Sequence, residues 1–82
     1  MIAKLPPGGT IARHRDTHPS FGICHRIHVP LQTGPEVMFI IGHSRIEAVE
    51  GVAFEINNLE PHEVHNRGER DRIHFIFDYA PR

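Results

Sequence analysis

Short apolar runs alternate with turn-forming residues along most of the chain. With seven Gly and seven Pro, no segment keeps a helical period long enough to predict a helix. The pattern predicts about seven strands separated by turns, which follow a turn or entry segment at residues 6–9. The predicted strands lie at residues 10–16, 23–31, 36–41, 45–49, 52–56, 63–66 and 71–79.

Short strands at such regular spacing are typical of an all-β sandwich or a jelly roll. An immunoglobulin-like sandwich is the alternative. Its usual support is missing, because the chain has no Trp and one Cys.

Two predicted strands carry polar side chains on one face and apolar side chains on the other. Alternation places Cys24, Arg26 and His28 on one face of the strand at residues 23–31. In the strand at residues 71–79, one face holds Ile73, Phe75 and Phe77, and the other holds Arg72, His74, Ile76 and Asp78. If the polar faces line a site, the apolar faces point outward. We therefore expect a homodimer, or further chain, to cover them.

Composition limits the classes of function. The chain has 82 residues, which is enough for one domain. Its net charge of −1 gives no basic excess for nucleic acid or an anionic membrane, and no apolar run is long enough to span a bilayer. Cys24 has no second Cys to pair with, and no signal peptide is visible, so a cytoplasmic location is expected. Eight of the 82 residues are His, which is an unusually large share. This favours a metal site over a chance surface enrichment only if the positions of these residues fit a set of metal ligands.

The positions of three residues suggest a metal site. His14 and Asp16 are two apart, so on a strand their side chains point the same way. A second histidine would complete a two-histidine, one-carboxylate triad, which is typical of non-haem iron oxygenases. His62 is the best candidate, because Gly51, His62 and Asn66 match the spacing of a second cupin motif. His65 is the competitor, but it would face away from His62 on the same strand. An accidental His-x-Asp tripeptide is the alternative for the first pair.

Arg72 follows His62 by ten residues, just after a predicted turn. An arginine there suits the distal carboxylate of a diacid such as 2-oxoglutarate, because its planar fork binds carboxylates with two hydrogen bonds. The alternative is a surface ion pair with Asp71 or Glu69.

Together these residues resemble the aspartyl/asparaginyl β-hydroxylase family, which includes bacterial proline hydroxylases. The resemblance is most specific in RIHVPL at residues 26–31, HEVHNRG at residues 62–68 and DRIHFIFD at residues 71–78. It implies a cupin-like double-stranded β-helix and Fe(II) held by His14, Asp16 and His62. It also implies a 2-oxoglutarate site using Arg72, with Arg26 and His28 lining the same pocket.

The resemblance further implies hydroxylation of an amino acid or of an Asp, Asn or Pro residue in a peptide. We treat residues 1–82 as one cupin-like domain, expected to lack the longer N-terminal segment of other family members. Two other functions stay open: a cupin-like metal protein without oxygenase activity, and a truncated inactive domain kept for interaction.

Overall fold

The computed structural model describes residues 1–15, 25–57 and 60–79, so Asp16 and Cys24 lie outside the described residues. These ranges form eight strands and no helix. Within them no helix of the length and hydropathy needed to cross a membrane is found.

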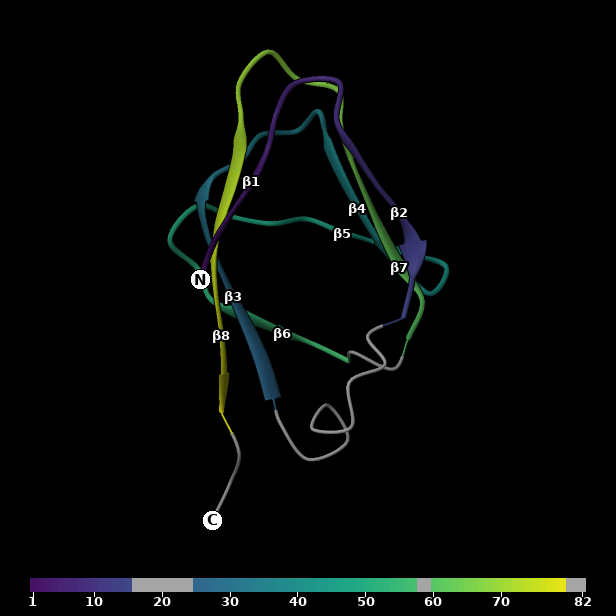
Figure 1. Cartoon of the computed structure of the whole chain (residues 1–82), viewed down its shortest axis with the longest axis vertical. Helices are drawn as coiled ribbons and strands as arrows, with labels where there is room; N and C mark the ends of the chain where they lie inside the picture. Colours follow the sequence, from purple (N-terminus) through teal and green to yellow (C-terminus); the bar gives the residue numbers. More distant parts are fainter. Residues whose placement is uncertain (16–24, 58–59, 80–82) are drawn as a thin grey trace.

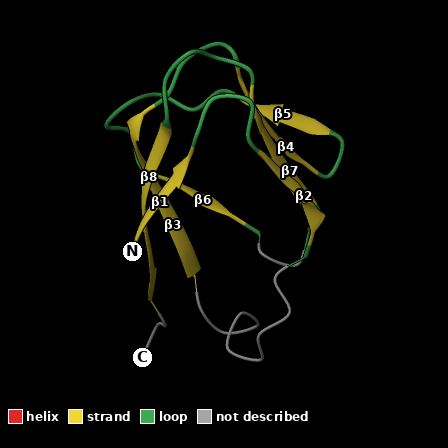
Figure 2. Ribbon diagram, turned by 45° about the horizontal axis from the view of Figure 1, so that its top comes forward, coloured by secondary structure: helices red, strands yellow, loops and turns green. Residues whose placement is uncertain are grey.

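The strands form two four-stranded antiparallel sheets that face each other (Figures 1 and 2). In one sheet the order is β1-β8-β3-β6, and in the other it is β2-β7-β4-β5. The bounds are β1 Ile2–Leu5, β2 Thr10–His14, β3 His25–Gln32, β4 Val37–Ile41, β5 Ser44–Ile46, β6 Phe54–Ile56, β7 His62–Asn66 and β8 Arg72–Tyr79.

The chain passes repeatedly from one sheet to the other, and only β4 and β5 are consecutive strands paired in one sheet. This arrangement is a small jelly roll, in which neighbouring strands come from distant parts of the sequence. The predicted all-β, jelly-roll fold is confirmed.

The structure contains one strand that was not predicted and shortens others, such as β6, which begins at Phe54 rather than at residue 52. β1 was not expected, because four residues carry too short a pattern and their partner β8 lies at the other end of the chain. β5 ends at Ile46 rather than continuing to Val49. The chain leaves this sheet there and crosses to β6 in the other sheet, so residues 47–49 have no strand to pair with.

The sheet β1-β8-β3-β6 turns its polar face inward. His28, Arg72 and His74 are buried on that face, as the alternation predicted. Its outer face carries apolar side chains in adjacent register positions, where Phe75 lies between Ile2 and Val29, and Phe77 lies beside Ile27. Ile2, Leu31, Phe75, Phe77 and Tyr79 are exposed there. The expected outward apolar face is therefore present.

The hydrophobic core is built from both sheets. Phe39 and Val64 are paired across β4 and β7, and each is only 2% exposed. Leu5 and Ile56 reach the same cluster from the opposite sheet. Burying a side chain of this size contributes about 1.5–3 kcal/mol. Apolar side chains from both sheets therefore hold the two inner faces together, and polar side chains lie among them.

Candidate functional site

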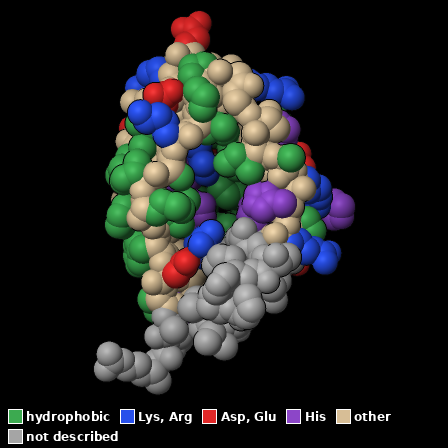
Figure 3. Space-filling view, viewed as in Figure 1, with side chains coloured by type: hydrophobic (Ala, Val, Ile, Leu, Met, Phe, Trp, Pro, Cys, Tyr) green, Lys and Arg blue, Asp and Glu red, His purple; other side chains and the backbone are tan. Residues whose placement is uncertain are grey.

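A cavity of about 200 Å³ lies between the two sheets. This is far more than the roughly 15 Å³ that one water molecule requires. Figure 3 shows histidine side chains beside the hollow. Five residues predicted from the sequence to form the site line this cavity: His14, Arg26, His28, His62 and Arg72.

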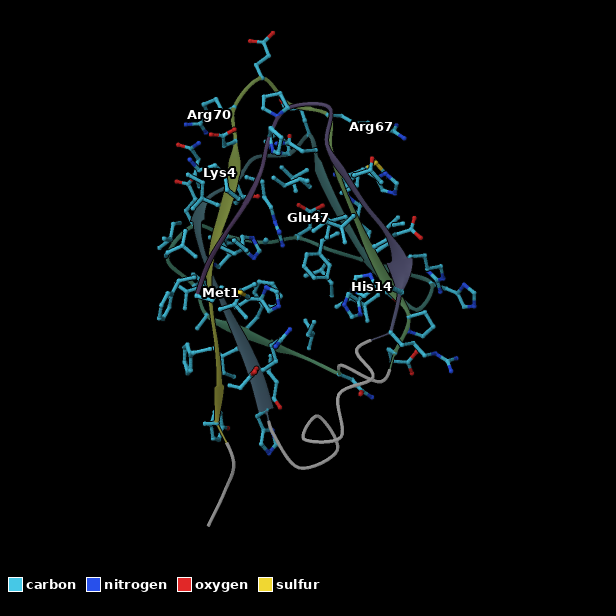
Figure 4. The ribbon with its side chains drawn as sticks, in the orientation of Figure 1. Met1, Lys4, His14, Glu47, Arg67 and Arg70 are labelled. Carbon is cyan, nitrogen blue, oxygen red and sulfur yellow. The ribbon has the colours of Figure 1, made fainter. Side chains whose placement is uncertain are left out.

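His14 and His62 lie opposite each other on β2 and β7, with ring centroids 4.3 Å apart. The pairing register shifts between Ile11 and His14, so β2 contains one extra residue there. This bulge turns both Ile11 and His14 toward the cavity although they are three residues apart, which strict alternation would forbid. In Figure 4, His14 lies at the end of β2 beside the space between the sheets.

Both rings are oriented by backbone carbonyl groups. The His14 Nδ1 donates to the Ala12 carbonyl at 2.7 Å, and the His62 Nδ1 donates to the Glu60 carbonyl at 2.9 Å. Because a carbonyl only accepts, each neutral ring carries its hydrogen on Nδ1 and its lone pair on Nε2. Metal-binding histidines in proteins are commonly fixed in this way.

The third predicted ligand, Asp16, lies outside the described residues. Among residues 1–15, 25–57 and 60–79, no three His, Cys, Asp or Glu side chains meet as a metal-binding group. His65 points away from the cavity, where its ring contacts Glu63 at 3.0 Å and Thr10 at 3.4 Å. The metal-ligand assignment of His14, Asp16 and His62 stays a prediction.

Arg72 is buried in the wall of the cavity and is 2% exposed. Its Nη2 donates to Nδ1 of His74 at 3.0 Å, and its Cζ lies 5.4 Å from the centre of the Phe39 ring. Its Nε has no hydrogen-bond partner among the residues that the structure describes. The alternative of a surface ion pair with Asp71 or Glu69 is wrong, because Arg72 is buried and Asp71 instead lies 3.9 Å from Lys4.

His28 and His74 form a buried pair beside Arg72, with their Nδ1 atoms 3.0 Å apart. Arginine only donates, so His74 Nδ1 accepts from Arg72 and His28 Nδ1 donates to it. Burial, followed by the charge of Arg72, lowers the pKa of His28 to about 4 and that of His74 to about 3. Burial also lowers the pKa of Arg72 to about 10. At neutral pH the histidines are therefore uncharged and the arginine is a cation.

Arg26 faces the cavity from β3 and is paired with Asp78 of β8. Its Nε donates to Oδ1 at 2.8 Å and its Nη2 donates to Oδ2 at 3.0 Å. The hydrogen bonds from Arg26 hold the pKa of Asp78 below its usual value. A carboxylate of the protein itself therefore balances the charge of Arg26.

Asn66 matches the cupin motif, but its contacts stabilise turns. It is 1% exposed, and its side-chain amide donates to the carbonyls of Leu5 and Arg70 at 2.9 Å and 2.8 Å. Its Oδ1 accepts from the backbone of Gly68 at 3.0 Å. Asn66 therefore fixes the ends of β1, β7 and β8, and with them the position of Arg72.

Sequence reasoning placed His74 and Asp78 on the inner face but assigned neither a role. The structure joins His74 to Arg72 and Asp78 to Arg26. The spacing of two residues from Arg72 to His74 was a usable signal, because such residues share a face of a strand. The pairing of Asp78 with Arg26 depends on the β3–β8 register, which alternation alone does not give.

Comparison with known proteins supports the fold and identifies the family. The crystal structure of TT1209 from Thermus thermophilus is similar in fold, with a TM-score of 0.67 and 22% identity over 99% of this chain and 70% of that one. A search of curated proteins finds no match. The family model for aspartyl/asparaginyl β-hydroxylases matches residues 1–81. The chain therefore belongs to the aspartyl/asparaginyl β-hydroxylase family.

Proposed function

We propose that this protein is an Fe(II)- and 2-oxoglutarate-dependent dioxygenase. Its substrate would be a free amino acid, or an Asp, Asn or Pro residue in a peptide. The observation that carries the proposal is the joint position of three residues on one cavity. His14 and His62 face each other at one side, and the buried cation Arg72 lines the same space.

The chemistry of the two rings fits an iron ion. Hydrogen bonds from Nδ1 to backbone carbonyls leave the lone pair of each ring on Nε2, the form that a divalent metal binds. His14 and His62 would hold the ion together with Asp16. Two histidines and one carboxylate leave coordination positions open for cosubstrate and dioxygen. The iron and 2-oxoglutarate supply the oxidising chemistry when bound.

The surroundings of Arg72 fit the distal carboxylate of 2-oxoglutarate. A buried cation is costly unless an anion or strong acceptors satisfy it. No carboxylate lies within ion-pair distance of Arg72 in the described part of the chain, and its Nε lacks an acceptor there. A diacid entering the cavity would supply both a negative charge and the missing acceptor. His28 and Arg26 line the same cavity and would contact the cosubstrate from β3.

The protein's own contribution is to orient and enclose the reactants. Phe39, Ile56, Val64 and Ile76 give the cavity apolar walls between the two polar groups. Such walls exclude water and strengthen the interaction of Arg72 with an anion. The alternatives are a metal-binding protein without oxygenase activity and an inactive domain. Neither explains a buried arginine opposite the histidine pair.

An anaerobic titration with Fe(II) and then 2-oxoglutarate tests the proposal. We expect a weak visible charge-transfer band on addition of 2-oxoglutarate, and succinate release once air and a substrate are supplied. Arg72→Gln should weaken 2-oxoglutarate binding by about 10- to 100-fold without changing Fe(II) binding. Arg70→Gln is the matched control, because the Arg70 side chain is 67% exposed. If wild-type protein gives neither band nor succinate, the proposal is wrong.

A further inference from the structure

Arg72 and His74 are the inward residues at one end of β8, two positions apart on the same strand face. The hydrogen bond from Arg72 Nη2 to His74 Nδ1 is 3.0 Å long. Both residues are at most 2% exposed, so no bulk water replaces this contact. Among the described residues, His74 therefore accepts a hydrogen bond from the guanidinium, while the Phe39 ring lies 5.4 Å from its Cζ.

His74 itself has little freedom to move. Its ring stacks on Phe39 with centroids 6.4 Å apart and meets Phe54 edge to face at 6.0 Å. On the third side, the Nδ1 of His28 donates to its Nδ1 at 3.0 Å. Because burial and Arg72 keep the ring neutral, Nδ1 retains its lone pair, which the donors of Arg72 and His28 share.

We propose that His74 is a positioning residue that holds the Arg72 guanidinium so that its remaining donors face the cavity and bind the distal carboxylate of the cosubstrate. This inference rests on the proposed function, since it assumes that the ligand is a 2-oxo diacid. An arginine side chain otherwise has several rotamers, and ordering it when the ligand binds weakens binding. Because His74 already holds the Arg72 guanidinium, the entropy of the side chain is lost on folding and not on ligand binding.

Two ligands isolate the effect of the distal carboxylate. 2-Oxoglutarate and 2-oxopentanoate share the 2-oxo acid end, but the second carries a methyl group in place of the distal carboxylate. Their dissociation constants are measured by anaerobic calorimetry on Fe(II)-loaded wild type, His74→Leu and His74→Asn. Asparagine keeps an acceptor close to the position of Nδ1, whereas leucine removes it. Circular dichroism on each variant reports folding.

We expect wild type to prefer 2-oxoglutarate strongly. His74→Leu should lose about 10-fold or more of that preference, the scale for one hydrogen bond to a charged group, while its affinity for 2-oxopentanoate stays unchanged. His74→Asn should keep most of the preference. If His74→Leu does not fold, His74→Gln makes the same comparison, because its amide reaches the position of Nε2 rather than Nδ1.

Two results would overturn the inference while leaving the proposed function intact. In one, the leucine variant keeps the full wild-type preference. In the other, the leucine variant loses affinity for both ligands equally, which is the result expected for general damage to the fold. If wild type itself does not distinguish the two ligands, Arg72 does not bind a distal carboxylate, and both the inference and the proposed function are wrong.

Discussion

Arg26 and Asp78 form a two-pronged ion pair across β3 and β8, with 2.8 Å between Nε and Oδ1 and 3.0 Å between Nη2 and Oδ2. Arg72, on the same cavity, has no such carboxylate among the residues described. The two arginines are therefore not equivalent, although sequence reasoning assigned both to the cosubstrate.

This difference predicts unequal effects of the same substitution. Arg26→Gln should weaken 2-oxoglutarate binding less than Arg72→Gln does, because the charge of Arg26 is already neutralised by Asp78. For Arg72→Gln we expect a loss of about 10- to 100-fold. Anaerobic calorimetry on both variants measures the contrast. Equal losses would mean that Arg26 contributes as much as Arg72 to binding the cosubstrate despite its ion pair with Asp78.

The metal assignment predicts that the histidines facing the cavity are needed for Fe(II) binding, whereas a histidine on the opposite strand face is not. His14→Ala and His62→Ala should each abolish tight Fe(II) binding, because each removes one ligand. His65→Ala is a matched control on the same strand as His62, since its ring points away from the cavity and contacts Glu63. Equilibrium dialysis with Fe(II) under anaerobic conditions checks this. Loss of binding in His65→Ala, with retention in His62→Ala, would reverse the assignment.

The buried histidines predict sensitivity to acid. The pKa of His28 is lowered from 6.5 to about 4, mainly by burial and then by Arg72, Arg26 and His62, with Asp78 acting in the opposite direction. Between these pH values the unfolded chain binds more protons, so stability is complete above about pH 6.5 and is lost as the pH falls toward 4. His74 adds to this loss over a range that extends to about pH 3.

Each such histidine lowers the free energy of unfolding by about 1.4 kcal/mol per pH unit within its window. The depressed pKa of Asp78 acts in the same direction, because its ion pair is lost when the carboxylate is protonated. Urea unfolding across this pH range measures the slope. His28→Asn should unfold with a shallower pH dependence than wild type, and an unchanged slope would exclude His28 as a source.

The exposed apolar residues on the outer face of β1, β8 and β3 favour a homodimer. Phe75 and Phe77 are 38% and 41% exposed, and they lie beside other apolar residues rather than singly. Contiguous apolar patches on soluble proteins are often covered by a partner, so the homodimer stays our prediction. Light scattering should give twice the chain mass, and Phe77→Lys should shift it toward the monomer. A wild-type monomer at high concentration would contradict this prediction.

Strand alternation was enough to predict most of the fold. Because side chains repeat every two residues, the inward positions of Arg26, His28 and Arg72 followed from the sequence alone. The bulge before His14 did not, since an extra residue in β2 has no pattern of its own. The Arg26–Asp78 pair was also missed, because cross-strand register depends on tertiary structure. β1 was missed because it is short and pairs only with the last strand.

The two sheets contribute different polar side chains to the cavity. The sheet β2-β7-β4-β5 supplies His14 and His62, while β1-β8-β3-β6 supplies Arg72 and His74, and both sheets give apolar side chains to the core. Substitution of Leu5, which is in the core but does not line the cavity, should chiefly lower stability, whereas substitution of Arg72 should chiefly change ligand binding. A family built on this plan can alter ligand preference by varying alternate positions of one terminal strand while keeping its scaffold.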